Sequence, residues 1–206
     1  MQGYANTSYE KLWHLSDLGF LRLAGPIAQD AARHHFPVYF HDSVVAAVQR
    51  SRALAHECGV SFVATLAQAS NSDAAVEVLG DAVLLEAMIE NVVCNALRSS
   101  PRGSRVELDV RVVGDSIALY VRDHGIGVAA DRLDSLFGWF EVSSESREPS
   151  RHGLDLAIAR RVAEHHRGTI SFRNRTGSGC EFEIKLPRWR AEGPASLRSL
   201  KATRAG

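Results

Sequence analysis

Two strand–turn–strand segments constrain the fold of this chain more than any other feature. Residues 106–113 and 117–121 alternate apolar and polar side chains around a Gly-Asp turn. Residues 169–174 and 180–186 repeat the pattern around the turn sequence Thr-Gly-Ser-Gly. Because a tight turn joins antiparallel strands, the sequence predicts a largely antiparallel sheet.

Helical patterns surround these hairpins. Apolar residues recur at helical spacing in residues 1–35, 43–57, 81–99 and 153–166, and residues 60–66 form a further strand pattern. The resulting order of elements predicts an α+β fold. We expect a two-layer sandwich, in which helices cover one face of a mixed, mostly antiparallel sheet.

Local signals refine two of these helices. Asp42 or Ser43 is expected to cap the helix of residues 43–57, and Gly59 to end it. The helix of residues 153–166 is expected to bury one stripe of side chains. That stripe consists of Leu154, Ala157, Ile158, Arg161, Val162 and His165. His165 and His166 close this helix, where a protonated histidine suits the helix dipole.

Composition narrows the class of protein. Lys and Arg number 24, as do Asp and Glu, which argues against a nucleic-acid partner. No apolar run approaches the length of a membrane helix, so we expect no membrane segment in this chain. The 3 cysteines lack the spacing of a zinc site or disulfide framework, which favours a reducing, cytoplasmic environment.

We expect three parts along the chain. Residues 1–42 form an N-terminal helical segment. Residues 43–188 form the main domain, and residues 189–206 form a basic, disordered tail.

The helix of residues 81–99 carries an unusual polar stripe. At about 100° per residue, Asn91, Asn95 and Arg98 fall on one side, opposite the apolar residues. A solvated surface would also be polar, but asparagine is a poor helix former and gains nothing there. Amide oxygens suit Mg²⁺ and a guanidinium suits phosphate, so this stripe is a candidate binding site.

The segment that follows the first hairpin is a second candidate. Asp123 ends an apolar strand, and Gly125 and Gly127 follow at once. The glycines and Ala130 fit a dinucleotide-binding fingerprint, but the parallel β–α–β context that this motif needs is missing. An ordinary Asp-x-Gly turn is the other alternative.

A series of segments, taken in order, resembles the ATP-binding domain of sensor histidine kinases, in the GHKL superfamily with the Bergerat fold. The resemblance covers about residues 43–187. The matching segments are the N box from Gly80 to Gly103, the first glycine box Asp123-His-Gly125-Ile-Gly127, the F box Phe137-Gly-Trp-Phe140, the second glycine box His152-Gly153-Leu154-Asp155-Leu156-Ala157, and the closing hairpin from Thr176 to Pro187.

This resemblance implies a pocket for the adenine of ATP. Asp123 would accept a hydrogen bond from the adenine amino group, where guanine presents an acceptor and would be rejected. Gly125 and Gly127 would allow the backbone to approach the ring and to take positive φ. Cys180 stands near the adenine, where the family usually has Ser or Thr.

The resemblance also implies a phosphate and Mg²⁺ site. Asn95 and Asn91 would hold Mg²⁺ against the phosphates, and Arg98 replaces the family's usual basic residue. An ATP lid would span about residues 128–152. Phosphate would then meet the backbone amides at the start of the next helix. The residues there are Arg151, His152, Gly153 and Leu154.

The implied activity is delivery of the γ-phosphoryl group of ATP to a histidine outside this chain. His41-Asp42 and His56-Glu57 resemble the phosphoacceptor dipeptide but come too late in the sequence. The implied partners are a dimerisation domain that carries the phosphoacceptor histidine, and a response regulator. By the same resemblance, the helical segment of residues 1–42 would be the end of a dimerisation helix. The full-length protein would be a homodimer, with this domain as the cytoplasmic part of a membrane-anchored sensor.

Two alternatives stay open. Asp155 replaces a glycine of the second glycine box, and its charge would repel a phosphate, with Arg151 available to offset it. A degenerate module that docks a response regulator or partner domain, with weak or no ATP binding, is therefore the second hypothesis. The third is an ATP-hydrolysing GHKL protein, which would place Glu where Asn91 stands; the neighbouring Glu90 points about 100° away.

Overall fold

The computed structural model describes residues 36–66, 76–129, 151–177 and 179–190, with residues 151–154 described by their backbone only. The expected helix before residue 36, the F box, most of the expected lid and most of the expected tail lie outside these residues. The described elements are β1 (Phe36–Tyr39), α3 (Phe40–Arg50), α4 (Arg52–Cys58), β2 (Ser61–Thr65), β3 (Glu77–Gly80), α5 (Ala82–Ser99), β4 (Arg105–Val113), β5 (Ser116–Arg122), α6 (Arg151–His165), β6 (Thr169–Asn174) and β7 (Cys180–Pro187).

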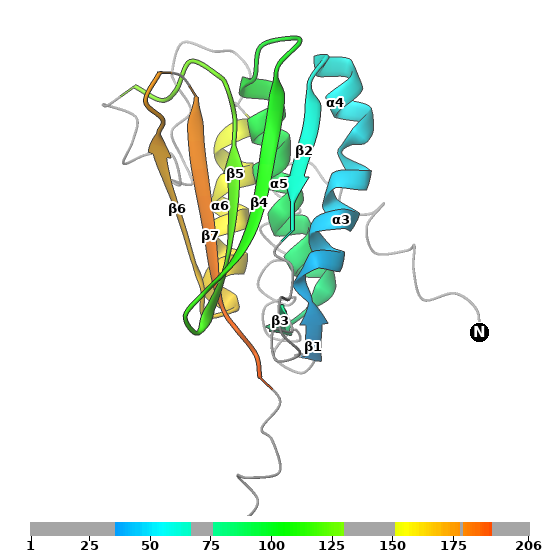
Figure 1. The fold of residues 1–206 in the computed structure, drawn as a ribbon, viewed down its shortest axis with the longest axis vertical. Helices are drawn as coiled ribbons and strands as arrows, with labels where there is room; N and C mark the ends of the chain where they lie inside the picture. The colour runs from blue at the N-terminus through cyan, green and yellow to red at the C-terminus, as the bar shows by residue number, and fades with distance from the viewer. Residues whose placement is uncertain (1–35, 67–75, 130–150, 178, 191–206) are drawn as a thin grey trace, which may run out of the picture. The chain divides into compact units, whose positions relative to one another are not determined.

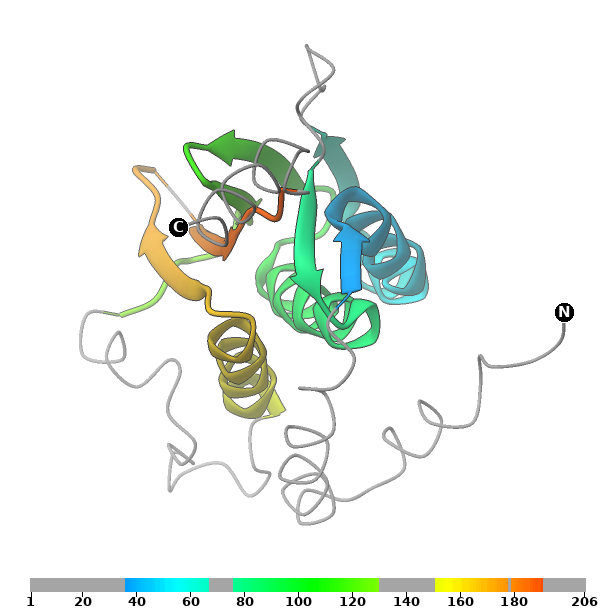
Figure 2. The ribbon, with the colours of Figure 1, turned by 90° about the horizontal axis from the view of Figure 1, so that it is seen from below.

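The main sheet has five strands in the order β2-β4-β5-β7-β6 (Figure 1). Strand β2 runs parallel to β4, and all other neighbours in this sheet are antiparallel. Both expected hairpins are present, as β4–β5 and β6–β7. Helices α5 and α6 lie side by side on one face of the sheet (Figure 2), so the α+β two-layer prediction is confirmed.

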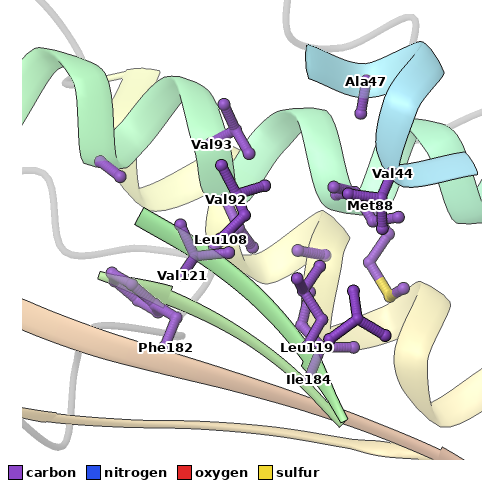
Figure 3. Close-up of a cluster of buried hydrophobic side chains, with 14 of the residues drawn as sticks. Val44, Ala47, Met88, Val92, Val93, Leu108, Leu119, Val121, Phe182 and Ile184 are labelled. Carbon is purple, nitrogen blue, oxygen red and sulfur yellow. The ribbon is translucent and has the colours of Figure 1, made fainter. Parts of the chain in front are cut away.

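The core lies between this sheet and the helices. Inward-facing residues of β4, β5 and β7 meet Met88, Val92 and Val93 of α5, and Val44 of α3 joins them (Figure 3). All apolar residues expected on the inner side of α5 are fully buried. They are Leu85, Ile89, Val92, Val93 and Ala96. The alternating apolar residues of the strands and the apolar residues at helical spacing in α5 therefore pack into one shared core.

A second, two-stranded sheet was not expected. Strand β1 pairs antiparallel with β3, and the backbone then enters α3 directly. Each strand is four residues long, too short to give a clear alternation signal. Strand β1 lies before residue 43, where the main domain was expected to begin. The expected limits of the three parts of the chain stay a prediction.

The single helix expected over residues 43–57 is wrong in two respects. It begins at Phe40, and Ser51 separates it into α3 and α4. Neither Asp42 nor Ser43 caps it, because Tyr39 is the N-cap and its side chain makes no capping bond. Burial of Phe40, Val44 and Ala47 explains the early start. Gly59 ends α4 in the left-handed conformation, as predicted.

The buried face of α6 also differs from the expectation. Its innermost residues are Leu156, Ala157, Ala159 and Ala163, whereas Ile158, Val162 and His165 are half-buried and Arg161 is exposed. Small alanine side chains allow α6 to pack against α5. The side chain of Leu154, also in the expected stripe, lies outside the described part of the structure.

His166 is buried rather than a charged residue at a helix end. Its Nε2 atom accepts a hydrogen bond from the backbone N–H of Asp81 at 3.1 Å. Its Nδ1 atom lies 2.8 Å from the carbonyl oxygen of Val162, to which it donates. Only a neutral imidazole makes both bonds, so His166 joins the end of α6 to the start of α5 as a neutral side chain.

In the part of the chain that the structure describes, no helix combines the length and the apolar character needed to cross a membrane. The longest described helix is α5, which has 18 residues and carries polar residues along one side.

The N-cap of α5 makes a testable contribution to stability. Asp81 Oδ1 accepts hydrogen bonds from Val83 N at 2.8 Å and Leu84 N at 3.3 Å. We expect Asp81→Ala to lower the free energy of unfolding by about 1 kcal/mol, measured by urea denaturation. Asp42→Ala is the control, because it removes only a charge near the start of α3 and should cost about half as much or less. Equal losses would contradict this assignment of the cap.

Candidate functional site

A buried carboxylate follows the end of β5. Asp123 is 1% exposed, and its backbone N–H donates to the carbonyl oxygen of Cys180 at 3.0 Å. Its Oδ1 atom accepts two backbone N–H groups, from Gly125 at 2.8 Å and from Cys180 at 3.0 Å. Among the described residues none donates to Oδ2. The carboxylate is therefore fixed in orientation, with one oxygen left for a ligand.

The glycines beside Asp123 allow close packing. A Cβ atom at Gly125 would overlap the carbonyl oxygen of Ser99, so this loop rests on the C-terminal end of α5. Gly127 has a φ of 80°, which L-residues rarely adopt. The expected positive φ thus occurs at Gly127, whereas Gly125 is needed for contact with Ser99, and the approach of this backbone to an adenine ring stays a prediction.

Gly179 closes the other side of Asp123. An added Cβ there would overlap the Asp123 carbonyl group. The sequence marked Gly179 only as part of a hairpin turn. Its contact with a residue 56 positions earlier shows that this turn forms one wall of the site.

Asn174 is a site residue that the sequence analysis missed. Its Oδ1 atom accepts from Val128 N at 2.9 Å, and its Nδ2 atom donates to Val128 O at 2.8 Å. The Cys180 thiol also lies 3.5 Å from Oδ1, to which it donates. A polar residue that ends a strand before a turn was the available signal. Asn174 fixes the backbone just after Gly127.

Arg175 is a second missed residue. Its Nη1 atom donates to the Asp123 carbonyl oxygen at 3.0 Å and to His124 Nδ1 at 3.2 Å. Since His124 Nδ1 accepts this bond, its proton is on Nε2, which lies 3.6 Å from Glu107 Oε1. Arg175 therefore places a positive charge beside Asp123.

Charge pairs on the open face of the sheet secure the register at this point. Arg122 directly precedes Asp123, and Glu181 directly follows Cys180. The two residues are partners in the β5–β7 ladder and form an ion pair. Glu181 also accepts from Arg173 Nε at 2.8 Å. Although burial acts to raise it, the hydrogen bonds from both arginines hold the pKa of Glu181 below its usual value.

The polar stripe of α5 lies where the sequence predicts it. Asn95 is 9% exposed and Asn91 is half-buried. Neither side-chain amide hydrogen-bonds to another described residue, so both retain their capacity for a ligand. Arg98 differs from the expectation, because its Nη1 atom pairs with Asp155 Oδ2 of α6 at 3.2 Å.

The two asparagines suit a metal ion that brings other ligands with it. No group of three or more His, Cys, Asp or Glu side chains within the described residues is arranged to hold a metal. Mg²⁺ needs few protein ligands when phosphate and water complete its octahedron. Amide oxygens at i and i+4 on one helix face fit that requirement.

The start of α6 carries backbone N–H donors that the helix itself cannot satisfy. Arg151, His152, Gly153 and Leu154 form its first turn, two residues earlier than expected. The first four N–H groups of an α-helix have no acceptor within the helix, and they favour an anion. The Arg98–Asp155 pair places this end of α6 beside the C-terminal part of α5.

Glu90 precedes the position of Asn91, where ATP-hydrolysing GHKL proteins have Glu, and its side chain is engaged elsewhere. It is 7% exposed, and its Oε2 atom accepts from Arg50 Nε at 3.0 Å. This contact holds Glu90 against α3, away from Asn91 and Asn95.

Comparison with known families agrees with this geometry. The profile of the histidine kinase-, DNA gyrase B- and HSP90-like ATPase family matches residues 80–190, more than half of the 206 residues. The chain belongs to this ATPase family.

Curated relatives place it on the histidine kinase branch. The sensor-like histidine kinase SenX3 of Mycolicibacterium smegmatis is 34% identical over 151 residues, which are 72% of this chain and 38% of SenX3. The sensor protein kinase PmrB of Pseudomonas aeruginosa is 36% identical over 132 residues, 60% of this chain and 28% of PmrB. The chain therefore spans well under half of these relatives, and it carries the ATP-binding catalytic domain of the sensor histidine kinase type.

Solved structures share the fold. The mycobacterial sensor histidine kinase MprB superposes with a TM-score of 0.63 at 24% identity, covering 77% of this chain and 100% of that one. Full-length ShkA, solved in complex with AMPPNP, gives 0.62 at 25% identity and covers 78% of this chain and 32% of that one.

Ionisation of Asp123 gives a pH prediction for this ATPase-family domain. Burial raises the pKa of Asp123 above its usual value, although the N–H groups of Gly125 and Cys180 act against the shift. At Asp123 the folded state then binds a proton more tightly than the unfolded state, so the contribution of this group to stability falls as pH rises through the carboxyl range. The free energy of unfolding of wild type, relative to that of Asp123→Asn, should therefore be lower at pH 7 than at pH 4, because the asparagine side chain does not titrate. Parallel pH profiles in urea unfolding would refute a raised pKa.

The Cys180 thiol gives a second prediction. Burial, with the charge of Asp123, raises the pKa of Cys180 to about 11, so little thiolate is present at pH 8. We expect iodoacetamide to modify Cys180 at least about tenfold more slowly than the half-buried Cys58, followed by mass spectrometry. Cys58→Ser removes the fast site, and peptide mapping then distinguishes Cys180 from Cys94, which is also buried. Equal rates in the folded protein would be inconsistent with this environment.

Proposed function

We propose that this chain binds Mg·ATP between the Asp123 loop, α5 and the start of α6, and presents the γ-phosphoryl group to a histidine on a partner domain. The observation that carries the proposal is the Asp123 carboxylate. It is almost fully buried and held through one oxygen by two backbone N–H groups. A buried acceptor in a fixed direction suits an exocyclic amino group, which adenine has at its sixth position.

The arrangement of α5 and α6 suggests where the phosphates of the nucleotide would bind, a region called the phosphate end of the site. Asn91 and Asn95 would ligate the metal, while Arg98 and the amides of residues 151–154 would bind phosphate oxygens. Mg²⁺ would neutralise phosphate charge when bound. The contribution of the chain's own residues is to orient the nucleotide, since phosphoryl transfer depends mainly on positioning and charge stabilisation.

The names of the relatives support transfer to histidine. SenX3 and PmrB are described as sensor kinases, and ShkA was solved with AMPPNP, an ATP analogue. The chain matches only part of these proteins, so the phosphoacceptor domain, the response regulator and homodimer formation belong to the proposal. A cytoplasmic setting fits ATP supply and the three free cysteines among the described residues.

One observation favours the second candidate, a docking module with weak ATP binding. Asp155 brings a negative charge to the phosphate end and engages Arg98. The two candidates differ in whether nucleotide binds at all, which calorimetry can decide.

The test is titration of Mg·ADP, Mg·ATP and Mg·GDP into wild type and Asp123→Asn. In the variant, Oδ1 keeps its two N–H donors and Nδ2 takes the place of Oδ2. A donor then faces the adenine amino group but suits the carbonyl oxygen of guanine. We expect micromolar adenine-nucleotide binding by wild type, and a fall of at least about tenfold in the preference for ADP over GDP in the variant.

Two results would redirect the proposal. If folded wild type binds no nucleotide at millimolar concentration, the docking module becomes the leading function. If the chain alone hydrolyses ATP appreciably, the ATP-hydrolysing hypothesis gains support despite the Arg50–Glu90 contact. Thermal unfolding of both proteins serves as the folding control.

A further inference from the structure

An ion pair crosses the phosphate end of the proposed site. Arg98 Nη1 on α5 lies 3.2 Å from Asp155 Oδ2 on α6, with side-chain exposures of 34% and 25%. Ser99, the next residue of α5, is the one against which Gly125 packs. The backbone that follows Arg98 therefore supports the loop of Asp123, while the Arg98–Asp155 pair joins the two helices proposed to bind phosphate.

This pair changes what Arg98 can offer a ligand. One of its terminal nitrogens already donates to a carboxylate, so a phosphate must displace Asp155 or bind the remaining N–H groups. Asp155 also lies within the first turns of α6, where an anion is favourable to the helix. The carboxylate thus provides, from within the chain, the negative charge that a nucleotide phosphate would bring.

From this geometry we infer that Asp155 is a specificity-determining residue. By holding Arg98, it lowers the affinity for the phosphate part of a nucleotide relative to the nucleoside part. The inference rests on the proposed function and deepens it, because it concerns how strongly that site distinguishes ADP and ATP from adenosine.

A purely structural tie between α5 and α6 would give a different result. Its loss would weaken folding and, through the shared scaffold, adenosine and ADP binding alike. A residue that competes with phosphate affects only the phosphate-dependent part. The informative quantity is therefore the ratio of the adenosine Kd to the ADP Kd.

The experiment measures both Kd values, by NMR titration for adenosine and calorimetry for Mg·ADP. The variants are Asp155→Asn, Arg98→Ala and the double variant. Glu86→Gln is the matched control, because Glu86 of α5 also pairs with an arginine of a neighbouring helix, Arg50 of α3. Its carboxylate lies 2.7 Å from Arg50 Nη2, with 22% side-chain exposure. We expect Asp155→Asn to raise the ratio at least about fivefold, and Glu86→Gln to leave it unchanged.

The double variant separates release of Arg98 from simple charge repulsion. Without the guanidinium, Asp155→Asn should raise the ratio by only about twofold, because no cation remains to be released. An equal gain in both backgrounds would overturn the inference, as would an unchanged ratio in Asp155→Asn while wild type binds ADP. If no variant binds adenosine or ADP, the proposed function itself fails, and the two failures are thus distinguishable.

Discussion

The fixed carboxylate of Asp123 is the interaction on which the site depends. Two backbone N–H groups, from Gly125 in the following loop and Cys180 in β7, meet on one oxygen. This arrangement joins three segments distant in sequence, because the Gly125 loop also rests on Ser99 of α5. Burial favours the protonated form and raises the pKa of Asp123, while the hydrogen bonds from Gly125 and Cys180 favour the ionised form and limit that rise. The Asp123 carboxylate thus both holds these segments together and offers its second oxygen to a ligand.

Helices α5 and α6 form the other half of the framework, and a polar contact joins them at each end. His166, just after α6, accepts from the backbone of Asp81 at the start of α5. Arg98, near the end of α5, pairs with Asp155 near the start of α6. The helices are therefore antiparallel, with an apolar contact between these two ends. The His166 end is buried and neutral, whereas the Arg98 end is partly exposed and charged, which is where a polyanionic ligand can exchange with protein groups.

The periodicity of apolar residues predicted the long and regular helices and strands. The 18-residue helix α5, its buried side and both hairpins follow from patterns that many residues share. The four-residue strands β1 and β3 could not be predicted, since short strands depend on pairing with distant segments. The face of α6 was misjudged because close helix packing selected alanines over larger side chains. Asn174 and the Arg98–Asp155 pair were missed because tertiary structure alone brings these partners together, across 46 and 57 positions.

The distribution of unused hydrogen-bonding capacity argues for one connected site. Asp123 Oδ2 and the amides of Asn91 and Asn95 have no hydrogen-bond partner among the described residues, although all three side chains are buried or half-buried. These atoms are not among the fully buried polar atoms that lack a partner, so they can be reached by solvent or by a ligand. The carboxylate accepts a donor and the amide oxygens suit a hard cation. An adenine amino group at one end and a phosphate-bound Mg²⁺ at the other would satisfy both requirements in a single molecule.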